Sequence, residues 1–342
     1  MMAKIIDSLA ALVTKRLAHK CSFFLLCCLL LGTPALADEA KLHKVSFIPQ
    51  WIPQAQFAGY YVAHEKGLYR KYNLQVEILR GGPEQPSSDL LAMGRADFGT
   101  TFLATAIQKR DQSIPLVNIG QIVQLSSLML VAKKSSDILS VEDIDGKKVG
   151  IWVPEFQVQP KAFFNKFNLA VQIIPQSTTV NLFLRGGVDV ASAMWYNEYH
   201  LILNSGINPD ELTTFFYFDH GLNFPEDGIY CLEKTFKATP ELSCNFVKAS
   251  IEGWKYAFEH PEEALDIVMQ YAREGNNPTN RAHQRWMLAR MQDIIMPAGK
   301  NIPLGRLRAE DYHRVVQELS KRDLITKSPS FSEFFVDCVS HD

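Results

Sequence analysis

The hydrophobic pattern in the first part of the chain alternates between strand and helix. Residues 43–48 and 74–79 alternate apolar and polar side chains, as half-buried strands do. Between them, residues 57–72 place apolar side chains at helical spacing. The pattern then predicts a helix over 87–93 and a strand over 128–132.

A second set of alternating elements begins near residue 143. It predicts strands and helices in the order 148–152, 160–167, 171–175, 179–185, 188–194 and 196–203. Strands that alternate with helices predict parallel sheets covered on both faces. Beyond residue 240 the pattern becomes almost wholly helical, with helices expected at 240–259, 261–273, 279–291 and 309–321.

The two α/β sets share a short motif, which indicates two versions of one module. Residues 93–99 read Met-Gly-Arg-Ala-Asp-Phe-Gly, and residues 185–191 read Arg-Gly-Gly-Val-Asp-Val-Ala. In each, we expect a helix to end at glycine and a strand to begin at the aspartate. Two similar lobes with a cleft between them form a ligand clamp, so the predicted fold class is a two-lobed α/β protein.

The N-terminal segment has the order of a secretory signal peptide. Four basic residues accompany an apolar run over 21–31, and Ala35-Leu36-Ala37 follows it. This order predicts a signal peptide over residues 1–37 with cleavage after Ala37, and hence a periplasmic protein. The apolar run is shorter than the about 20 residues that span a bilayer. An uncleaved membrane anchor is the alternative.

Charge and cysteine content narrow the function classes. The chain has 35 basic and 37 acidic residues, a formal net charge of −2, and lacks a basic stripe that would neutralise phosphates. Nucleic-acid binding is therefore disfavoured. Beyond the signal, Cys231, Cys244 and Cys338 remain. Cys231 and Cys244 could form a disulfide in an oxidising compartment, or remain buried free thiols; the sequence leaves both open.

Motifs of catalysis are missing from the sequence. It contains no G-x-S-x-G, no H-E-x-x-H and no glycine-rich phosphate loop. The histidines are scattered, without metal-ligand spacing, and we interpret each as a surface or capping residue. We therefore expect no enzyme activity, no cofactor and no metal site.

Aromatic and amide side chains instead gather where predicted strands end. Trp51, Gln54 and Gln56 follow the first strand directly. Ligands of open α/β sheets bind at the carboxyl ends of strands. An indole there can stack on a flat ring, and amides can hydrogen-bond to its edge. The alternative is that Trp51 fills the core.

Other predicted ligand-binding residues lie near later strand ends or the expected return between lobes: Phe98, Thr100 and Thr101; Trp152; Trp195, Tyr196, Asn197 and Glu198; and Asn223. For the two threonines, helix capping is the alternative. We expect Trp51, Trp152 and Trp195 to face one cleft. A buried Glu198 carboxylate would pair with a ligand N–H. This composition predicts a planar nitrogen heterocycle as the ligand.

At these residues the sequence resembles a known family. The similar stretches are 51–63 (WIPQAQFAGYYVA), 66–69 (KGLY), 94–99 (GRADFG), 145–150 (DGKKVG) and 196–198 (YNE). The family is the periplasmic solute-binding proteins of ABC importers related to the thiamine-pyrimidine synthases. The resemblance covers about residues 43–295. It implies a type II periplasmic binding protein fold, with lobe 1 formed by 43–132 and 229–325 and lobe 2 by 133–228.

The resemblance also implies partners and a choice of ligands. We expect a monomer that binds a small-molecule ligand and an ABC importer permease. The ligand would be a thiamine pyrimidine precursor, such as formylaminopyrimidine or hydroxymethylpyrimidine. Gln54 and Gln56 stand where asparagines are common in the pyrimidine-binding branch. Riboflavin or a sulfonate as the ligand, and a ligand-sensing module, are the alternatives.

A further alternative is a pyridoxal-phosphate-dependent pyrimidine synthase, which shares this fold. Thr101 and Thr105 stand at that enzyme's lysine and histidine positions. Without the lysine no Schiff base can form. The cysteine-rich run of the enzyme is also missing from residues 221–231.

Overall fold

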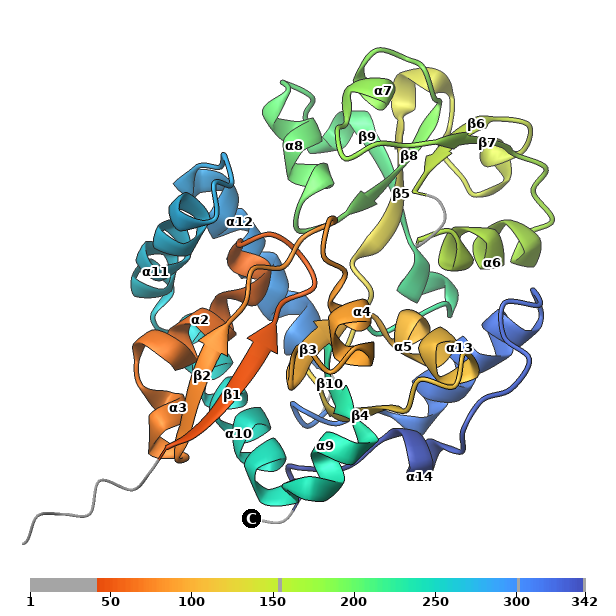
Figure 1. Ribbon diagram of the computed structural model, residues 1–342. Coiled ribbons are helices and arrows are strands. Elements are labelled where there is room, and N and C mark those ends of the chain that lie inside the picture. The colour runs from red at the N-terminus through yellow and green to blue at the C-terminus, as the bar shows by residue number, and fades with distance from the viewer. Residues whose placement is uncertain (1–41, 153–155, 300–301, 341–342) are drawn as a thin grey trace, which may run out of the picture. The chain divides into compact units, whose positions relative to one another are not determined.

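The computed structural model describes residues 42–152, 156–299 and 302–340, so the expected signal peptide over 1–37 lies outside the described residues. Two five-stranded sheets organise the described chain (Figure 1). The first sheet has the order β2-β1-β3-β10-β4, and the second has the order β7-β6-β8-β5-β9.

The first sheet contains β1 (His43–Ile48), β2 (Leu74–Ile78), β3 (Phe98–Thr101), β4 (Leu116–Gln121) and β10 (Gly228–Leu232). The second contains β5 (Leu128–Lys133), β6 (Lys148–Ile151), β7 (Gln172–Pro175), β8 (Val190–Met194) and β9 (Leu212–Phe216). The strands predicted from alternation are confirmed. The sequence pattern missed β4, β9 and β10, and it treated Phe98–Thr101 as the end of a strand, whereas this segment is the strand.

Both sheets are mixed, so the prediction of parallel sheets is wrong in one respect. β10 runs antiparallel to β3 and β4. β5 takes the corresponding place in the second sheet, antiparallel to β8 and β9. Each antiparallel strand enters its sheet directly after the chain has left the other sheet, which reverses its direction. The matching strand orders confirm two versions of one module.

The shared glycine-aspartate motif performs the same structural task in both sheets. Gly94 and Gly186 have φ angles of +66° and +72°, in the left-handed region that favours glycine at a helix end. Asp97 accepts a hydrogen bond from the Ser46 amide in β1 at 2.8 Å. Asp189 accepts one from the Lys148 amide in β6 at 2.9 Å. Each carboxylate therefore fastens its own strand to a neighbouring strand.

The chain crosses between the sheets earlier than expected. The predicted lobe boundary at 132/133 leaves residues 128–132 in lobe 1, but β5 pairs with β8 and β9, with Leu128 opposite Met194. The two crossing segments are therefore residues 122–127 and 217–227. Movement of the two sheets as separate lobes stays a prediction.

Helices cover the sheets, as the alternation predicts. They are η1 (Ala55–Phe57), α2 (Ala58–Glu65), α3 (Leu68–Lys71), α4 (Ser87–Ala92), α5 (Leu103–Asp111), η2 (Lys134–Ser136), η3 (Glu142–Ile144), α6 (Val158–Lys166), α7 (Asn181–Leu184), α8 (Glu198–Asn204), η4 (Pro209–Glu211) and η5 (Tyr217–His220). The helix expected over 57–72 is broken, because Gly67 adopts a φ of +68° between α2 and α3.

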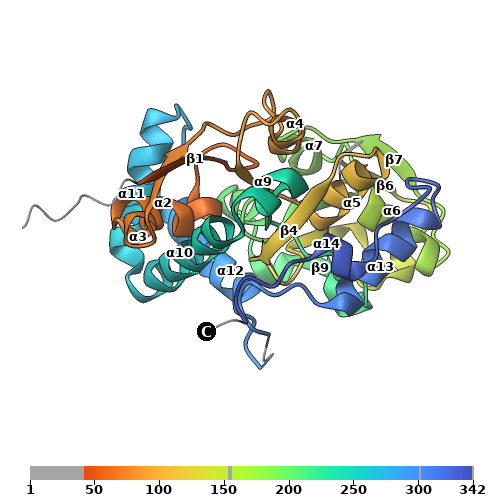
Figure 2. The same cartoon turned by 60° about the horizontal axis from the view of Figure 1, so that its bottom comes forward.

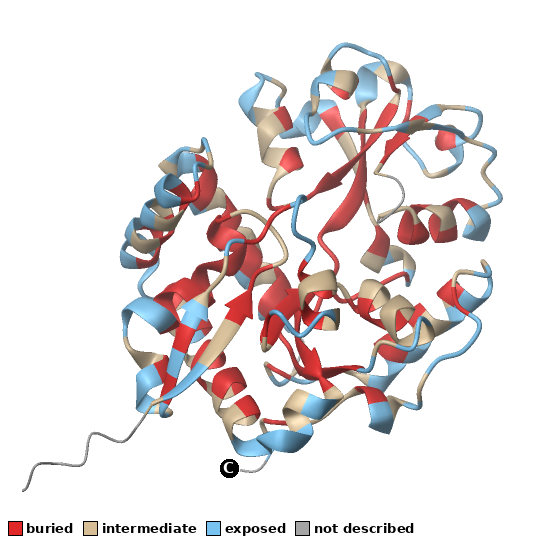
Figure 3. Ribbon diagram, viewed as in Figure 1, coloured by how far each residue is buried: buried red, intermediate tan, exposed pale blue. Residues whose placement is uncertain are grey.

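The remainder of the described chain is mostly helical, as expected. It contains α9 (Glu233–Ala238), α10 (Pro240–Glu259), α11 (Pro261–Glu274), α12 (Arg281–Ile295), α13 (Ala309–Ser320) and α14 (Phe331–Phe334). α10 packs closely on α2 because both carry glycine at the contact: a Cβ on Gly253 would lie 2.1 Å from the Gly59 carbonyl oxygen. The buried faces of these helices and the strands form the core (Figure 3). Among the described helices, none is long and apolar enough to cross a membrane.

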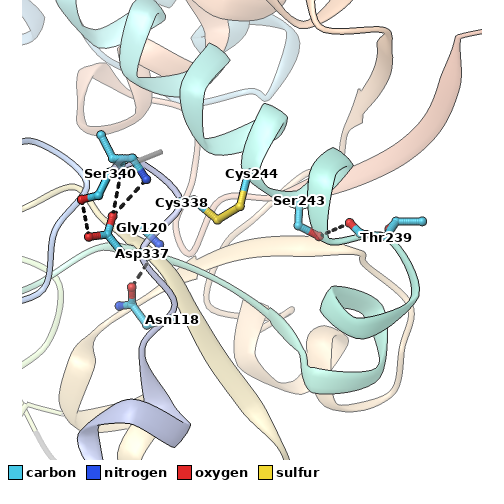
Figure 4. The surroundings of a disulfide bond; sticks show 9 residues. Asn118, Gly120, Thr239, Ser243, Cys244, Asp337, Cys338 and Ser340 are labelled. Carbon is cyan, nitrogen blue, oxygen red and sulfur yellow. Dashed lines mark hydrogen bonds between the residues drawn. A yellow bond between two sulfur atoms is a disulfide. The ribbon is translucent and has the colours of Figure 1, made fainter. Parts of the chain in front are cut away.

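The C-terminal segment is fastened back onto the first sheet. Cys338 forms a disulfide with Cys244 of α10 (Figure 4). Cys231 is a buried free thiol, so a Cys231–Cys244 disulfide is excluded. Nearby, the Val336 amide donates to the Asn118 carbonyl of β4 at 2.9 Å. Helix α13, which precedes this segment, packs against α5 and also against α6, which follows β6 of the second sheet (Figures 1 and 2).

Candidate functional site

The two crossing segments are bonded to each other through Asn223. Its Oδ1 accepts from the Ser126 amide at 2.9 Å, and its Nδ2 donates to the Gln124 carbonyl at 3.0 Å. The same Nδ2 lies 3.2 Å from Oδ1 of Asp311 in α13. Asn223 therefore holds the connection between the sheets. Its predicted contact with a ligand stays a prediction.

Glu226 makes a second link between the crossing segments. Its carboxylate accepts hydrogen bonds from the amide and the hydroxyl of Ser127, at 2.5 and 3.0 Å, and from the Ser126 hydroxyl at 3.2 Å. Burial raises the pKa of Glu226 to about 7, although these donors favour the ionised form. An acid that titrates near neutrality thus lies where the chain passes between the sheets.

The first predicted group meets this region through a chain of amides. Gln54 Nε2 donates to Gln56 Oε1 at 2.7 Å, and Gln56 Nε2 donates to Asp227 Oδ2 at 2.7 Å. Burial raises the pKa of Asp227 well above its usual range. Asp227 precedes β10, which is antiparallel, so it lies at the edge where β3 and β4 end. Trp51 in the same loop is half-buried and packs against the main hydrophobic core.

The β3 group is mainly structural. Phe98 is buried and stacks on Phe246, with ring centres 4.4 Å apart. The Thr100 hydroxyl accepts from the Gln50 amide at 3.0 Å and so fastens the loop that carries Trp51. Thr101 is buried opposite Gly228 of β10. Neither threonine caps α5, whose N-cap residue is Phe102.

Trp152 belongs to an aromatic line that joins the two sheets. Its indole Nε1 donates to the Ser177 carbonyl at 2.9 Å. Its ring meets Phe156 edge-on, with ring centres 6.0 Å apart. Phe156 in turn meets Phe102, which follows β3 of the first sheet, at 5.1 Å. The structure thus adds Phe102 and Phe156 to the candidate site.

The β8 group is bonded to α12. Asn197 Oδ1 lies 2.9 Å from His283 Nε2, and the Trp286 indole donates to the Trp195 carbonyl at 3.1 Å. The Trp195 ring meets the Arg290 guanidinium at 4.8 Å. Helix α12 packs with η1, α10 and α11 beside the first sheet, and β8 belongs to the second sheet. This contact therefore also joins the two sheets. This contact between the end of β8 and α12 is separate from the Phe102–Phe156 contact, which joins the end of β3 to the segment before α6.

Glu198 is held tightly at the start of α8. Its Oε2 accepts from the Met194 amide at 3.0 Å, and its Oε1 accepts from Asn197 Nδ2 at 2.8 Å. Burial raises the pKa of Glu198 to about 7. Each carboxylate oxygen already has a protein donor and keeps further acceptor capacity.

Tyr196 connects these acids electrostatically. Its side chain is buried, and burial raises the pKa of its hydroxyl well above the usual range, with further contributions from Glu226, Asp227 and Glu198. Three buried acids, Glu226 and Asp227 of the second crossing segment and Glu198 after β8, therefore contribute to the electrostatic environment of one tyrosine. Because burial raises the pKa of all three acids, a ligand in this region meets carboxyl groups that are partly protonated near neutral pH and that accept hydrogen bonds.

Sequence reasoning missed the partners on α12. His283, Trp286 and Arg290 meet residues of α8 and the β8 end that are 83 or more positions away in the chain. No local spacing marks such contacts. His200 and His283, interpreted from the sequence as surface or capping residues, contact each other at 2.8 Å between their Nδ1 atoms, and His283 is buried.

Two surface pockets lie elsewhere, beside β1, β2 and the end of α2, and neither is lined by a predicted site residue. Within the described residues, no three His, Cys, Asp or Glu side chains are grouped so that they could hold a metal ion. The strand-end aromatic, amide and carboxyl groups described above are therefore the candidate site, and ligand contact with them stays a prediction.

The two-sheet architecture is that of periplasmic binding proteins. It superposes on the aliphatic sulphonate-binding protein SsuA of Escherichia coli with a TM-score of 0.67 at 14% identity, over 85% of this chain and 96% of that one. Residues 54–264 match the family described as NMT1/THI5 like. The chain belongs to this family.

Several relatives carry names of binding proteins or of thiamine biosynthesis. A riboflavin-binding protein of Chloroflexus aurantiacus is 27% identical, over 71% of this chain and 70% of that protein. A Haemophilus influenzae protein named for thiamine biosynthesis is 26% identical, over 90% and 95%. A formylaminopyrimidine-binding protein of Halalkalibacterium halodurans is 23% identical, over 85% and 89%.

The family also includes proteins named as enzymes. A 4-amino-5-hydroxymethyl-2-methylpyrimidine phosphate synthase of Legionella pneumophila is 26% identical, over 69% of this chain and 76% of that protein. Membership of the family therefore does not tell a binding protein from an enzyme. The residues of the site have to make that distinction.

Proposed function

We propose that this protein is an extracytoplasmic solute-binding protein of an ABC importer, and that it captures a thiamine pyrimidine precursor such as formylaminopyrimidine or hydroxymethylpyrimidine. The observation that carries the proposal is that three buried acids lie close in the fold: Glu226 accepts from the Ser127 amide, Glu198 accepts from the Met194 amide at the end of β8, and Asp227 follows Glu226. Buried carboxyl groups favour a ligand that donates hydrogen bonds or carries positive charge.

The acids favour an aminopyrimidine over a sulfonate. An amino-substituted pyrimidine offers exocyclic N–H donors and a basic ring nitrogen, and both pair well with a carboxylate. A sulfonate carries a permanent negative charge and no N–H donor, so it would gain no hydrogen bond to a carboxylate and would be repelled by any of these acids that is ionised. The similarity to sulphonate-binding proteins extends to the fold, not to this chemistry.

The half-buried aromatic residues support a flat ligand. Trp51 lies after β1, and Trp152 and Trp195 lie at the ends of strands in the second sheet. Ring stacking adds about 0.5–1.5 kcal/mol per contact beyond the burial of apolar area. Riboflavin, the ligand named for one relative, is also flat and is the second candidate.

Catalysis is not favoured at this site. Thr101, at the position of the synthase lysine, is buried in β3 opposite Gly228. It cannot form a Schiff base with pyridoxal phosphate. Purified protein incubated with pyridoxal phosphate is therefore expected to show no absorbance band of an internal aldimine.

Isothermal titration calorimetry tests the ligand. We expect hydroxymethylpyrimidine or formylaminopyrimidine to bind with at least tenfold higher affinity than an alkanesulfonate, with riboflavin as the comparison ligand. Preferential binding of the sulfonate would reject the proposed ligand class. Riboflavin binding without pyrimidine binding would leave a solute-binding protein with a different heterocycle.

A further inference from the structure

His200 and His283 form a contact between two helices. Helix α8 follows β8 of the second sheet, and helix α12 packs beside the first sheet. Their rings are stacked with centres 5.1 Å apart, and their Nδ1 atoms are 2.8 Å apart. His200 also stacks on Trp286, at 4.8 Å and an interplanar angle of 6°. Since His283 is buried, the pair is part of the packing between the two helices.

The hydrogen-bond partners determine where the imidazole protons lie. Asn197 Nδ2 donates to Glu198, so its Oδ1 faces His283 Nε2. That nitrogen must carry hydrogen to donate. In a neutral His283 the Nδ1 is then bare, and it accepts from Nδ1–H of His200. Asn204 Nδ2 also lies 3.3 Å from His200 Nδ1, and this longer contact is not a hydrogen bond when that nitrogen carries the proton. The result is a one-way chain of donors from His200 through His283 and Asn197 to the buried Glu198 carboxyl.

From this geometry we propose that His200 and His283 form an acid-opened clasp, which holds the two sheets together and positions Asn197 and Glu198 for the ligand. One extra proton is tolerated, because the pair can share a single N–H between the two Nδ1 atoms. A second proton places N–H against N–H at 2.8 Å, which is repulsive. The contact between α8 and α12 then separates.

Most of the surrounding charges are paired with one another. The charged or titratable groups around the pair include Glu198 and Tyr199 of α8; Glu262 and Asp266 of α11, which pair with Arg281 and Arg285 of α12; and Arg290 of α12, which pairs with Asp293. The Arg290 guanidinium already lies 4.7 Å from the Trp286 ring centre. A charged His200 would bring a second cation to the same ring.

Burial supports the sign of the effect. It lowers the pKa of His283 to about 4, with a further contribution from His200. The pKa of His283 is about 4 with the contact closed and about 6.5, the usual histidine value, when the side chain is exposed. The contact is therefore fully stable above pH 6.5, and this stability is lost as the pH falls from 6.5 toward 4. Opening is therefore expected in acid and closure near neutrality.

The test measures the distance between the sheets without ligand. Fluorophores on Asp210→Cys and Arg273→Cys, both exposed positions, report the distance from η4, which lies between α8 and β9, to α11 in the full protein. We expect a longer distance at pH 4.5 than at pH 7.5. His283→Gln, which keeps an amide donor but does not titrate, should remain closed at both pH values, and His283→Ala should be open at both.

His43→Gln, an exposed histidine at the start of β1, is the matched control and should open like the parent protein. An unchanged distance in the parent protein, or acid opening retained by His283→Gln, would overturn the clasp. Ligand affinity is measured on the same variants, and His283→Ala should lose roughly tenfold or more at pH 7.5. Only this affinity measurement rests on the proposed function. If the protein opens in acid but does not bind the pyrimidine, the proposed function is rejected and the clasp is not.

Discussion

Asn223 in the second crossing segment and Asp311 in α13 are joined by a hydrogen bond of 3.2 Å. Asp311 is fully buried and also pairs with Arg308 and Arg314. Helix α13 therefore holds the amide that bonds the two crossing segments. This gives the C-terminal segment a role at the connection between the sheets, which the sequence had left unassigned.

Replacement of Asp311 should destabilise the protein. Asp311→Ala removes the buried carboxylate that Arg308, Arg314 and the Asn223 amide share, and we expect a loss of about 3 kcal/mol in the free energy of unfolding. Urea unfolding followed by circular dichroism measures it. Glu310→Ala, at the neighbouring exposed position, should change stability by less than about 0.5 kcal/mol. Equal effects of the two variants would contradict the role given to Asp311.

Glu226 should make stability depend on pH. Burial raises its pKa to about 7, so the protonated form is preferred in the folded protein. Its contribution is complete below the unfolded pKa of about 4.3 and is lost as the pH rises through 7. We expect Glu226→Gln to lose less stability than the parent protein between pH 5 and pH 8, by about 1–3 kcal/mol.

The comparison is made by urea unfolding at several pH values. Glu310→Gln, an exposed carboxyl replaced by its amide, is the matched control and should follow the parent curve. If Glu226→Gln and the parent protein have parallel curves, Glu226 does not titrate in this range.

The Cys244–Cys338 disulfide should contribute substantially to stability. It closes a loop with a sequence separation of 94 residues. A cross-link over a loop of this length restricts the unfolded chain, and its removal costs about 2–5 kcal/mol. The double variant Cys244→Ser, Cys338→Ser should unfold at lower urea concentration than the parent protein.

Cys231→Ala is the control for this variant, because Cys231 is a buried free thiol that takes no part in the bridge. Peptide mapping without reduction should recover a peptide that links residues 244 and 338. A linked peptide containing Cys231 would be incompatible with the disulfide described above.

Loss of Trp195 should weaken ligand binding. Its ring lies at the end of β8 and contacts Arg290 of α12 at 4.8 Å. We expect Trp195→Ala, and likewise Trp51→Ala, to reduce affinity by about 1–3 kcal/mol through lost stacking and burial. Calorimetry with hydroxymethylpyrimidine measures the effect. Tyr256→Ala, which removes a ring bonded to Glu263 on α11, is expected to bind normally. Normal affinity of both tryptophan variants would remove these residues from the site.

Local pattern predicted much of this fold from the sequence. Alternation identified β1, β2 and β5 to β8, and the repeated glycine-aspartate motif identified the two modules. It did not identify β10, since Gly228–Leu232 is buried on both faces and shows no alternation. The lobe boundary at 132/133 failed for a related reason: the sheet to which β5 belongs depends on its partners, β8 and β9, which come later in the chain.

The candidate site was less predictable from the sequence. The sequence placed Gln56 and the segment after β8 at strand ends; Gln56 bonds to Asp227 beside β10, and Asn197 contacts His283 of α12, while their contact with a ligand stays a prediction. Phe98 was assigned to the site, but its ring stacks on Phe246 in the core. His200 and His283 could not be paired from the sequence, because packing of α8 on α12 brings them together across 83 residues.

A crystal structure of the protein with hydroxymethylpyrimidine bound tests the central claim most directly. The account predicts the ring between the two sheets, stacked on at least one of Trp51, Trp152 and Trp195, with its amino group bonded to one of the buried carboxyls. A ring bound in the surface pocket beside His64 and β2, or density only at an unrelated surface, would contradict the account.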